Sequence, residues 1–180
     1  MKKTVMILIT AVIFVAMAFG TALADAASVA KGELAPIGHD QKIVEAVKAQ
    51  NAKGLTMDYI KMVDKGWKGQ PADTYFIKEL RENKCSGYCR AIIEKVPYMT
   101  EIFVMDNQGA NVCMSGTTGD YWQGDEAKWQ KSFADGKGAI FVDEPEDEDG
   151  KMVQQISVPV MDGGKAIGAI TFGVLADEVK

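Results

Sequence analysis

The sequence predicts an α+β domain built on one antiparallel sheet, with helices before the sheet and a further helix over one of its faces. Apolar residues recur at helical spacing as far as residue 95, and the period changes to two after Pro97. The strands that follow are joined by tight glycine turns at residues 106–109 and 162–165. Strands joined in hairpin order pair antiparallel, and no internal repeat suggests another architecture.

The individual elements follow from this change of period. Four helices are expected over residues 40–53, 56–67, 73–80 and 87–95, because each carries an apolar stripe and a cap or breaker. Five strands are expected over residues 102–105, 110–115, 139–142, 152–160 and 166–174. Between the second and third strands, residues 124–133 predict the helix over the sheet, with Trp129 and Phe133 on its apolar face.

The first 24 residues resemble a secretory signal peptide. Lys2 and Lys3 precede an uncharged apolar run, and Ala22-Leu23-Ala24 forms a small-x-small cleavage site. A membrane span needs about 20 apolar residues, so an uncleaved anchor is the alternative. We therefore expect a periplasmic protein with a flexible segment at 25–37, one domain at 38–180, and no stable membrane insertion after cleavage.

Charge and motif content narrow the possible functions. Without Lys2 and Lys3 the chain has 18 basic and 25 acidic residues, which argues against nucleic acid or an anionic membrane as partner. With His39 as the only histidine and no nucleophile, phosphate or metalloprotease motif, we expect neither an enzyme nor a metal or cofactor site. The acidic segment 143–150 lacks the ligand order of a calcium loop, so it predicts a solvated hairpin tip.

Three cysteines suggest one disulfide in an oxidising compartment. Cys85 and Cys89 are the candidate pair, since Gly87 between them would permit a bend. Cys113 lies on a predicted strand and is expected to be a buried small residue. The three-residue spacing differs from covalent haem attachment, whereas noncovalent haem remains open.

The segment 120–129 concentrates rings and polar groups suited to a small ligand. Tyr121, Trp122 and Trp129 could supply stacking surfaces, and packing of these rings in the core is the alternative. The other candidates are polar groups in the same run and a tyrosine that would close the opposite side. They are Gln123, Asp125, Lys128 and Tyr98.

Three stretches in order, residues 102–112, 127–133 and 156–170, resemble the Cache family of extracytoplasmic sensor domains, which have a PAS-like fold. They resemble its first hairpin, its tryptophan-centred helix and its closing glycine-turn hairpin, over about half of the mature chain. Ala127 and Gln130 stand where amino-acid-sensing members have an arginine and a tyrosine, which argues against an amino-acid ligand.

The resemblance implies a periplasmic sensor domain that binds an organic acid or amine between the sheet and the aromatic loop. It would present the bound state to a membrane-bound sensor or receptor. Since the sequence ends at Lys180, we expect a freestanding module. The alternatives are a redox or noncovalent haem-binding protein that uses Cys85 and Cys89, or a structural accessory subunit whose sheet edge pairs with another chain.

Overall fold

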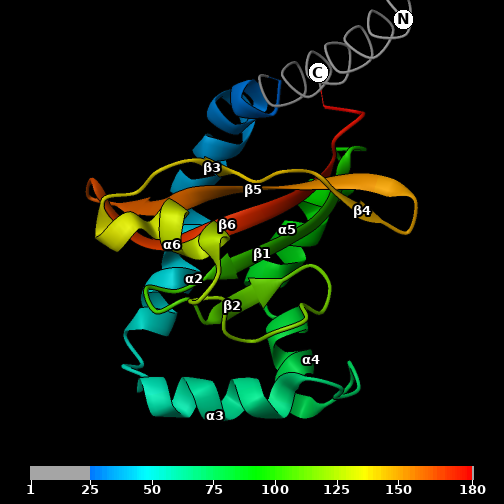
Figure 1. Cartoon of the computed structure of the whole chain (residues 1–180). Helices are drawn as coiled ribbons and strands as arrows, with labels where there is room; N and C mark the ends of the chain where they lie inside the picture. Colours follow the sequence, from blue (N-terminus) through cyan, green and yellow to red (C-terminus); the bar gives the residue numbers. More distant parts are fainter. Residues whose placement is uncertain (1–24, 180) are drawn as a thin grey trace, which may run out of the picture.

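A computed structural model describes residues 25–179, which form an α+β domain around one six-stranded antiparallel sheet (Figure 1). Helices α2 and α5 cover one face, α3 and α4 lie beyond the β2 edge, and α6 (Ala127–Phe133) packs on β5 and β6 from the other face. The expected signal peptide at 1–24 lies outside the described residues. No helix in the described part is long and apolar enough to cross a membrane.

The N-terminal segment is helical from its first described residue. Residues 25–29 continue into η1 (Ala30–Leu34), η2 (Ala35–His39) and then α2 (Gln41–Asn51). Ala26, Val29 and Leu34 are buried in the main core cluster. The expectation of a flexible segment at 25–37 was therefore wrong, because these apolar residues form a helical stripe among the small and charged ones.

Three further helices precede the sheet, namely α3 (Met57–Trp67), α4 (Tyr75–Glu82) and α5 (Lys84–Ile93). Thr56 caps α3 by accepting from the backbone N–H of Tyr59 at 3.3 Å. Asn83 caps α5 by accepting from Ser86 N–H at 2.9 Å. This cap starts α5 three residues earlier than the spacing of its apolar residues predicted.

The strands are β1 (Met99–Met105), β2 (Asn111–Met114), β3 (Phe141–Val142), β4 (Glu146–Glu148), β5 (Lys151–Asp162) and β6 (Lys165–Leu175). They lie in the order β2-β1-β6-β5-β3, and β4 also pairs with β5. The α+β prediction is confirmed, with one strand more than expected. The extra strand β4 lies within the acidic segment 143–150. Its three side chains are exposed to solvent, while its backbone pairs with β5.

The two faces of the sheet differ in polarity. The even-numbered residues of β1, β5 and β6, among them Ile102, Ile156 and Phe172, face the N-terminal helices and form the main core. The odd-numbered residues face α6 and include Ser157 and Thr171. A sheet with one apolar and one partly polar face leaves room for a polar site on the second face.

The disulfide joins Cys85 on α5 to Cys113 on β2, which corrects the expected Cys85–Cys89 pairing. Cys85 and Cys89 lie one turn apart on an unbroken helix, so Gly87 produces no bend. Cys89 is a free, buried thiol whose Sγ lies 4.0 Å from that of Cys113. Burial raises the pKa of Cys89 to about 12, so the thiol stays protonated and poorly nucleophilic.

Candidate ligand-binding site

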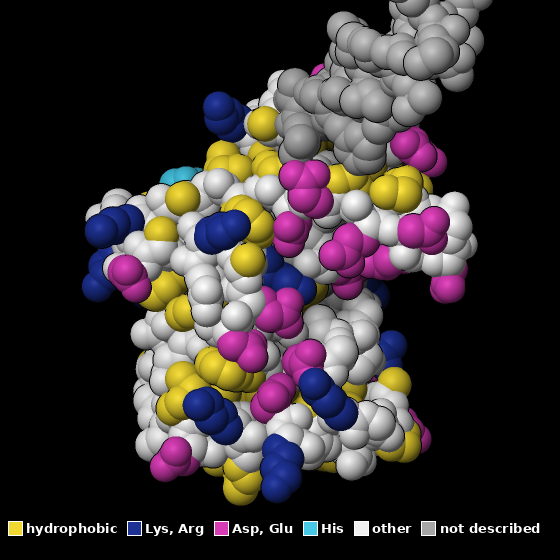
Figure 2. Space-filling view, in the orientation of Figure 1, with side chains coloured by type: hydrophobic (Ala, Val, Ile, Leu, Met, Phe, Trp, Pro, Cys, Tyr) yellow, Lys and Arg dark blue, Asp and Glu magenta, His cyan; other side chains and the backbone are white. Residues whose placement is uncertain are grey.

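The polar face of the sheet carries a cavity beneath α6 and the segment 118–126. It consists of two adjoining hollows of about 200 Å³ each, which share Glu126, Lys128 and Gln155. We call this the sheet-face cavity. Its further lining residues are Glu101, Phe103, Thr118, Gly119, Asp120, Gln123, Asp143, Glu144, Glu146, Glu148 and Val153. Acidic side chains gather over the middle of this side of the molecule (Figure 2).

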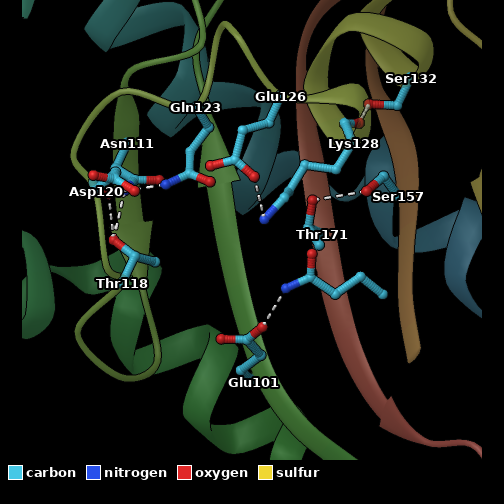
Figure 3. Close-up of polar contacts among 11 residues, drawn as sticks. Glu101, Asn111, Thr118, Asp120, Gln123, Glu126, Lys128, Ser132, Ser157 and Thr171 are labelled. Atoms are coloured by element: carbon cyan, nitrogen blue, oxygen red, sulfur yellow. Dashed lines mark hydrogen bonds and ion pairs between the residues drawn. The ribbon is translucent and has the colours of Figure 1, made fainter. Parts of the chain in front are cut away.

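A row of three residues across neighbouring strands forms the base of the cavity. Glu101 on β1 faces Gly173 on β6, which in turn faces Gln155 on β5. Because Gly173 has no side chain, Gln155 Nε2 reaches over it and donates to Glu101 Oε1 at 3.0 Å (Figure 3). A Cβ on Gly173 would lie 2.6 Å from Glu101 Cγ, so the glycine is required for this contact.

The carboxyl group of Glu101 is desolvated. Burial raises its pKa above the ordinary value of 4.5, while the bond from Gln155 and the charge of Lys128 act in the opposite direction. Within residues 25–179 no basic side chain forms an ion pair with Glu101. The carboxylate therefore has one amide donor and an open side towards the cavity.

Lys128 projects from α6 over the same space. Its side chain is 14% exposed, and its Nζ lies 2.8 Å from Glu126 Oε2 and 5.5 Å from the ring centre of Phe103. In the next cross-strand pair, Ser157 on β5 and Thr171 on β6 form a hydrogen bond of 2.8 Å with each other. Lys128 forms its direct ion pair with Glu126, so among residues 25–179 it acts on Glu101 through its charge and not through an ion pair.

The segment over the cavity is held by the protein itself. The backbone N–H groups of Tyr121 and Trp122 both donate to Asp64 Oδ1 on α3 at 2.9 Å. Asn111 N–H donates to Tyr121 O, and Gln123 N–H donates to Gly109 O. The segment thus pairs with the turn and strand beside it, and this pairing positions Gln123 at the cavity before any ligand binds.

Two of the seven residues proposed from the sequence, Gln123 and Lys128, line the sheet-face cavity. Trp129 packs on Phe133 with 5.0 Å between ring centres, and its indole N–H donates to Asp106 O at 2.9 Å. Trp122 donates its indole N–H to Gln108 O at 2.8 Å. Both indole N–H groups donate to backbone oxygens of the protein, so the two side chains hold α6 and the segment 118–126 in place.

The remaining three proposed residues lie elsewhere. Tyr121 is 1% exposed and belongs to an aromatic cluster under α3 and α4. Asp125 is exposed and lines neither hollow of the cavity. Tyr98 bonds to Glu33 at 2.7 Å, next to the N-terminal helices. The structure therefore does not bring these three side chains together at the sheet-face cavity.

Sequence reasoning missed Glu101 and Gln155, the two residues at the base of the cavity. A signal for them was present in β5, where Gln155 and Ser157 stand at alternate positions on either side of the apolar Ile156. Polar residues at every second position of a strand mark a face that is not filled by core. Glu101 occupies the matching position on β1.

No family model matches the chain, and no curated protein matches it. Among solved structures it is similar to the sensor domain of the Vibrio cholerae histidine kinase DctB, at 13% identity and a TM-score of 0.46 over 87% of this chain and 51% of that one. The sensory domain of the Campylobacter jejuni chemoreceptor Tlp3 matches at 13% identity and a TM-score of 0.44, over 89% and 66%.

A third match is the ligand-binding domain of the Pseudomonas aeruginosa amino-acid chemoreceptor PctC in complex with GABA, at 15% identity and a TM-score of 0.38, over 82% and 60%. These are Cache-type extracytoplasmic domains. This chain spans about half to two thirds of the length of these three domains.

Proposed function

We propose that this protein is a small-molecule sensor module that binds a ligand bearing an ammonium group in the sheet-face cavity. The observation that carries the proposal is the desolvated carboxylate of Glu101, which faces the cavity without a cationic partner in the described part. An ammonium group would supply the missing charge and hydrogen bonds. Gln123 and Gln155 would orient the remainder of the ligand above the ring of Phe103.

The charge distribution favours an amine over an organic acid. Among the described residues, Lys128 is the only basic one that lines the cavity, and Glu126 already pairs with it. Four more carboxylates surround the adjoining hollow, at Asp143, Glu144, Glu146 and Glu148. A carboxylate ligand would meet this negative potential, whereas a cation would be attracted to the opening by it.

A signalling role follows from where the ligand would make contact. Lys128 belongs to α6 and Gln123 to the segment before it, so a ligand would join both to the strand residues Glu101 and Gln155. Such contacts would favour the arrangement in which α6 and its preceding segment are closed onto the sheet. We propose that a membrane-bound sensor or receptor recognises that arrangement and that the chain is not an enzyme.

The proposal is tested with four compounds of equal chain length: butylamine, butyrate, 4-aminobutyrate and putrescine. Calorimetric titration should show binding of the compounds that carry an ammonium group and none of butyrate. Glu101→Gln keeps the shape but removes the charge, and should weaken butylamine binding about 10- to 100-fold, as expected for a hydrogen bond to a charged group. Glu82→Gln, on α4 away from the cavity, is the matched control.

Two results would overturn the proposal. One is binding of butyrate without binding of butylamine, which would assign the cavity to an acid. The other is butylamine binding that Glu101→Gln leaves unchanged, which would place the ammonium group elsewhere.

A further inference from the structure

A second cavity of about 370 Å³ lies at the β2 edge of the sheet, between α2, α4 and the start of α5. We call it the edge cavity. It shares no lining residue with the sheet-face cavity, and its volume falls in the range of small-molecule sites, about 300–1,000 Å³. The proposed sensor function makes no use of it.

Aromatic rings form the inner wall of the edge cavity. The ring centre of Tyr121 lies 5.3 Å from that of Phe76 and 5.6 Å from that of Trp67. Tyr121 and Phe76 both line the cavity, and Tyr121 is 1% exposed, so its ring is fixed by packing. A rigid aromatic wall suits a flat apolar ligand, because neither partner loses much freedom on contact.

One buried polar side chain lies among these rings. Gln50 on α2 is 6% exposed and lines the cavity. Tyr121 lines the same cavity, and burial raises the pKa of its phenol, so the phenol stays neutral. The inner end of the edge cavity is therefore uncharged where it meets a ligand.

The charge at the opening of the edge cavity is positive. Lys53 and Lys84 line it, and among residues 25–179 neither forms an ion pair. Within the part of the chain that the structure describes, Glu79 is the only acidic residue in the lining. A neighbouring groove between α2 and α5 shares Lys84 and carries one further residue of each charge, Lys42 and Glu45. Both lysines of the edge cavity are exposed, so they remain hydrated until a ligand arrives.

We infer that the edge cavity is a second ligand site, for a small carboxylate with a flat apolar body. The apolar body packs against Phe76 and Tyr121, and the carboxylate meets Lys53 and Lys84 at the opening. The carboxylate end is opposite in charge to the ammonium group proposed for the sheet-face cavity. One protein would then bind two ligand classes, at two sites that differ in the polarity of their lining side chains and in their charge.

The test uses a series of carboxylates, namely acetate, phenylacetate and indole-3-acetate, with phenethylamine as the cation of matched shape. Titration calorimetry should show binding of phenylacetate and indole-3-acetate, and weak or absent binding of acetate, because acetate lacks the apolar body. The double variant Lys53→Gln/Lys84→Gln should weaken phenylacetate binding about tenfold. Lys78→Gln, on α4 outside the cavity, is the matched control.

A second variant separates this inference from the sheet-face site. Ala49→Leu places extra methyl groups in the edge cavity and should reduce phenylacetate binding while leaving butylamine binding intact. Glu101→Gln should leave phenylacetate binding unchanged. Absence of binding across the apolar carboxylates, or phenylacetate binding that the lysine double variant does not alter, would overturn the inference without affecting the ammonium site.

Discussion

The two cavities use the same segment of chain for opposite chemistry. Asp120 and Gln123 line the sheet-face cavity, whereas Tyr121 between them lines the edge cavity. The segment runs between the two cavities and is held beside the sheet by the β-bridge between Trp122 and Ala110. A single run of residues thereby serves as one wall of a polar acidic cavity and one wall of an aromatic cavity with lysines at its opening.

Contacts of Tyr121 and of α6 lie between the two cavities. The backbone N–H of Tyr121 donates to Asp64 Oδ1, and the indole N–H of Trp129 on α6 donates to Asp106 O. Trp129 lies next to Lys128 on α6, which reaches into the sheet-face cavity. Variants at Tyr121, Asp64 and Gly173 test whether a change at one cavity affects ligand binding in the other.

The largest effect is expected for Tyr121→Ala. Removing this buried ring leaves a hole between Trp67 and Phe76 and should lower the free energy of unfolding by about 3–5 kcal/mol, measured by chemical denaturation. Tyr121→Phe keeps the ring and should cost about 1 kcal/mol or less. Similar stability of the alanine variant and the wild type would show that Tyr121 is not a core residue.

Asp64→Ala tests whether the shared segment depends on α3. The carboxylate accepts from two backbone N–H groups, at Tyr121 and Trp122. Its loss should lower the free energy of unfolding by about 1.5–3 kcal/mol and weaken the binding of both butylamine and phenylacetate. Asp73→Ala, before α4, is the control. An effect on one ligand alone would contradict the shared wall.

Gly173→Ala should affect only the sheet-face cavity. The new Cβ would lie 2.6 Å from Glu101 Cγ and 2.7 Å from Thr100 Oγ1, so Glu101 must move away from Gln155. Overpacking of this kind costs about 1–3 kcal/mol of stability, and butylamine binding should fall with it. Phenylacetate binding should not change, and a parallel loss of both ligands would argue that the cavities are one site.

The smallest expected effect is the pH dependence of stability that Glu101 contributes. Its pKa is raised in the folded state, so at neutral pH the buried charge destabilises the protein, and protonation removes this cost. Compared with Glu101→Gln, the wild type should gain stability as the pH falls through the raised pKa, until the ordinary value of 4.5 is reached. The raised pKa of Asp106 is common to both proteins and cancels in the difference.

The sequence was sufficient for the sheet, the helices before it and the turns, because hydrophobic periodicity reflects which face of each element is buried. It failed at 25–37 and at β4, where small or charged residues form regular structure through tertiary packing and strand pairing. For the site, the sequence predicted ligand contacts for rings such as Tyr121, because aromatic residues are common both in the core and in pocket walls. Glu101 and Gln155 depend on strand register across Gly173, which only the folded sheet reveals.

The most direct test of the ammonium proposal is to measure the pKa of Glu101 itself. Carbon-detected NMR of its side-chain carboxyl gives this pKa from a pH titration with and without butylamine. In the free protein we predict a pKa above the ordinary value of 4.5. Because an ammonium group stabilises the ionised carboxylate, saturating butylamine should lower that pKa. A Glu101 pKa that butylamine leaves unchanged, at a concentration where calorimetry shows binding, would contradict the proposal.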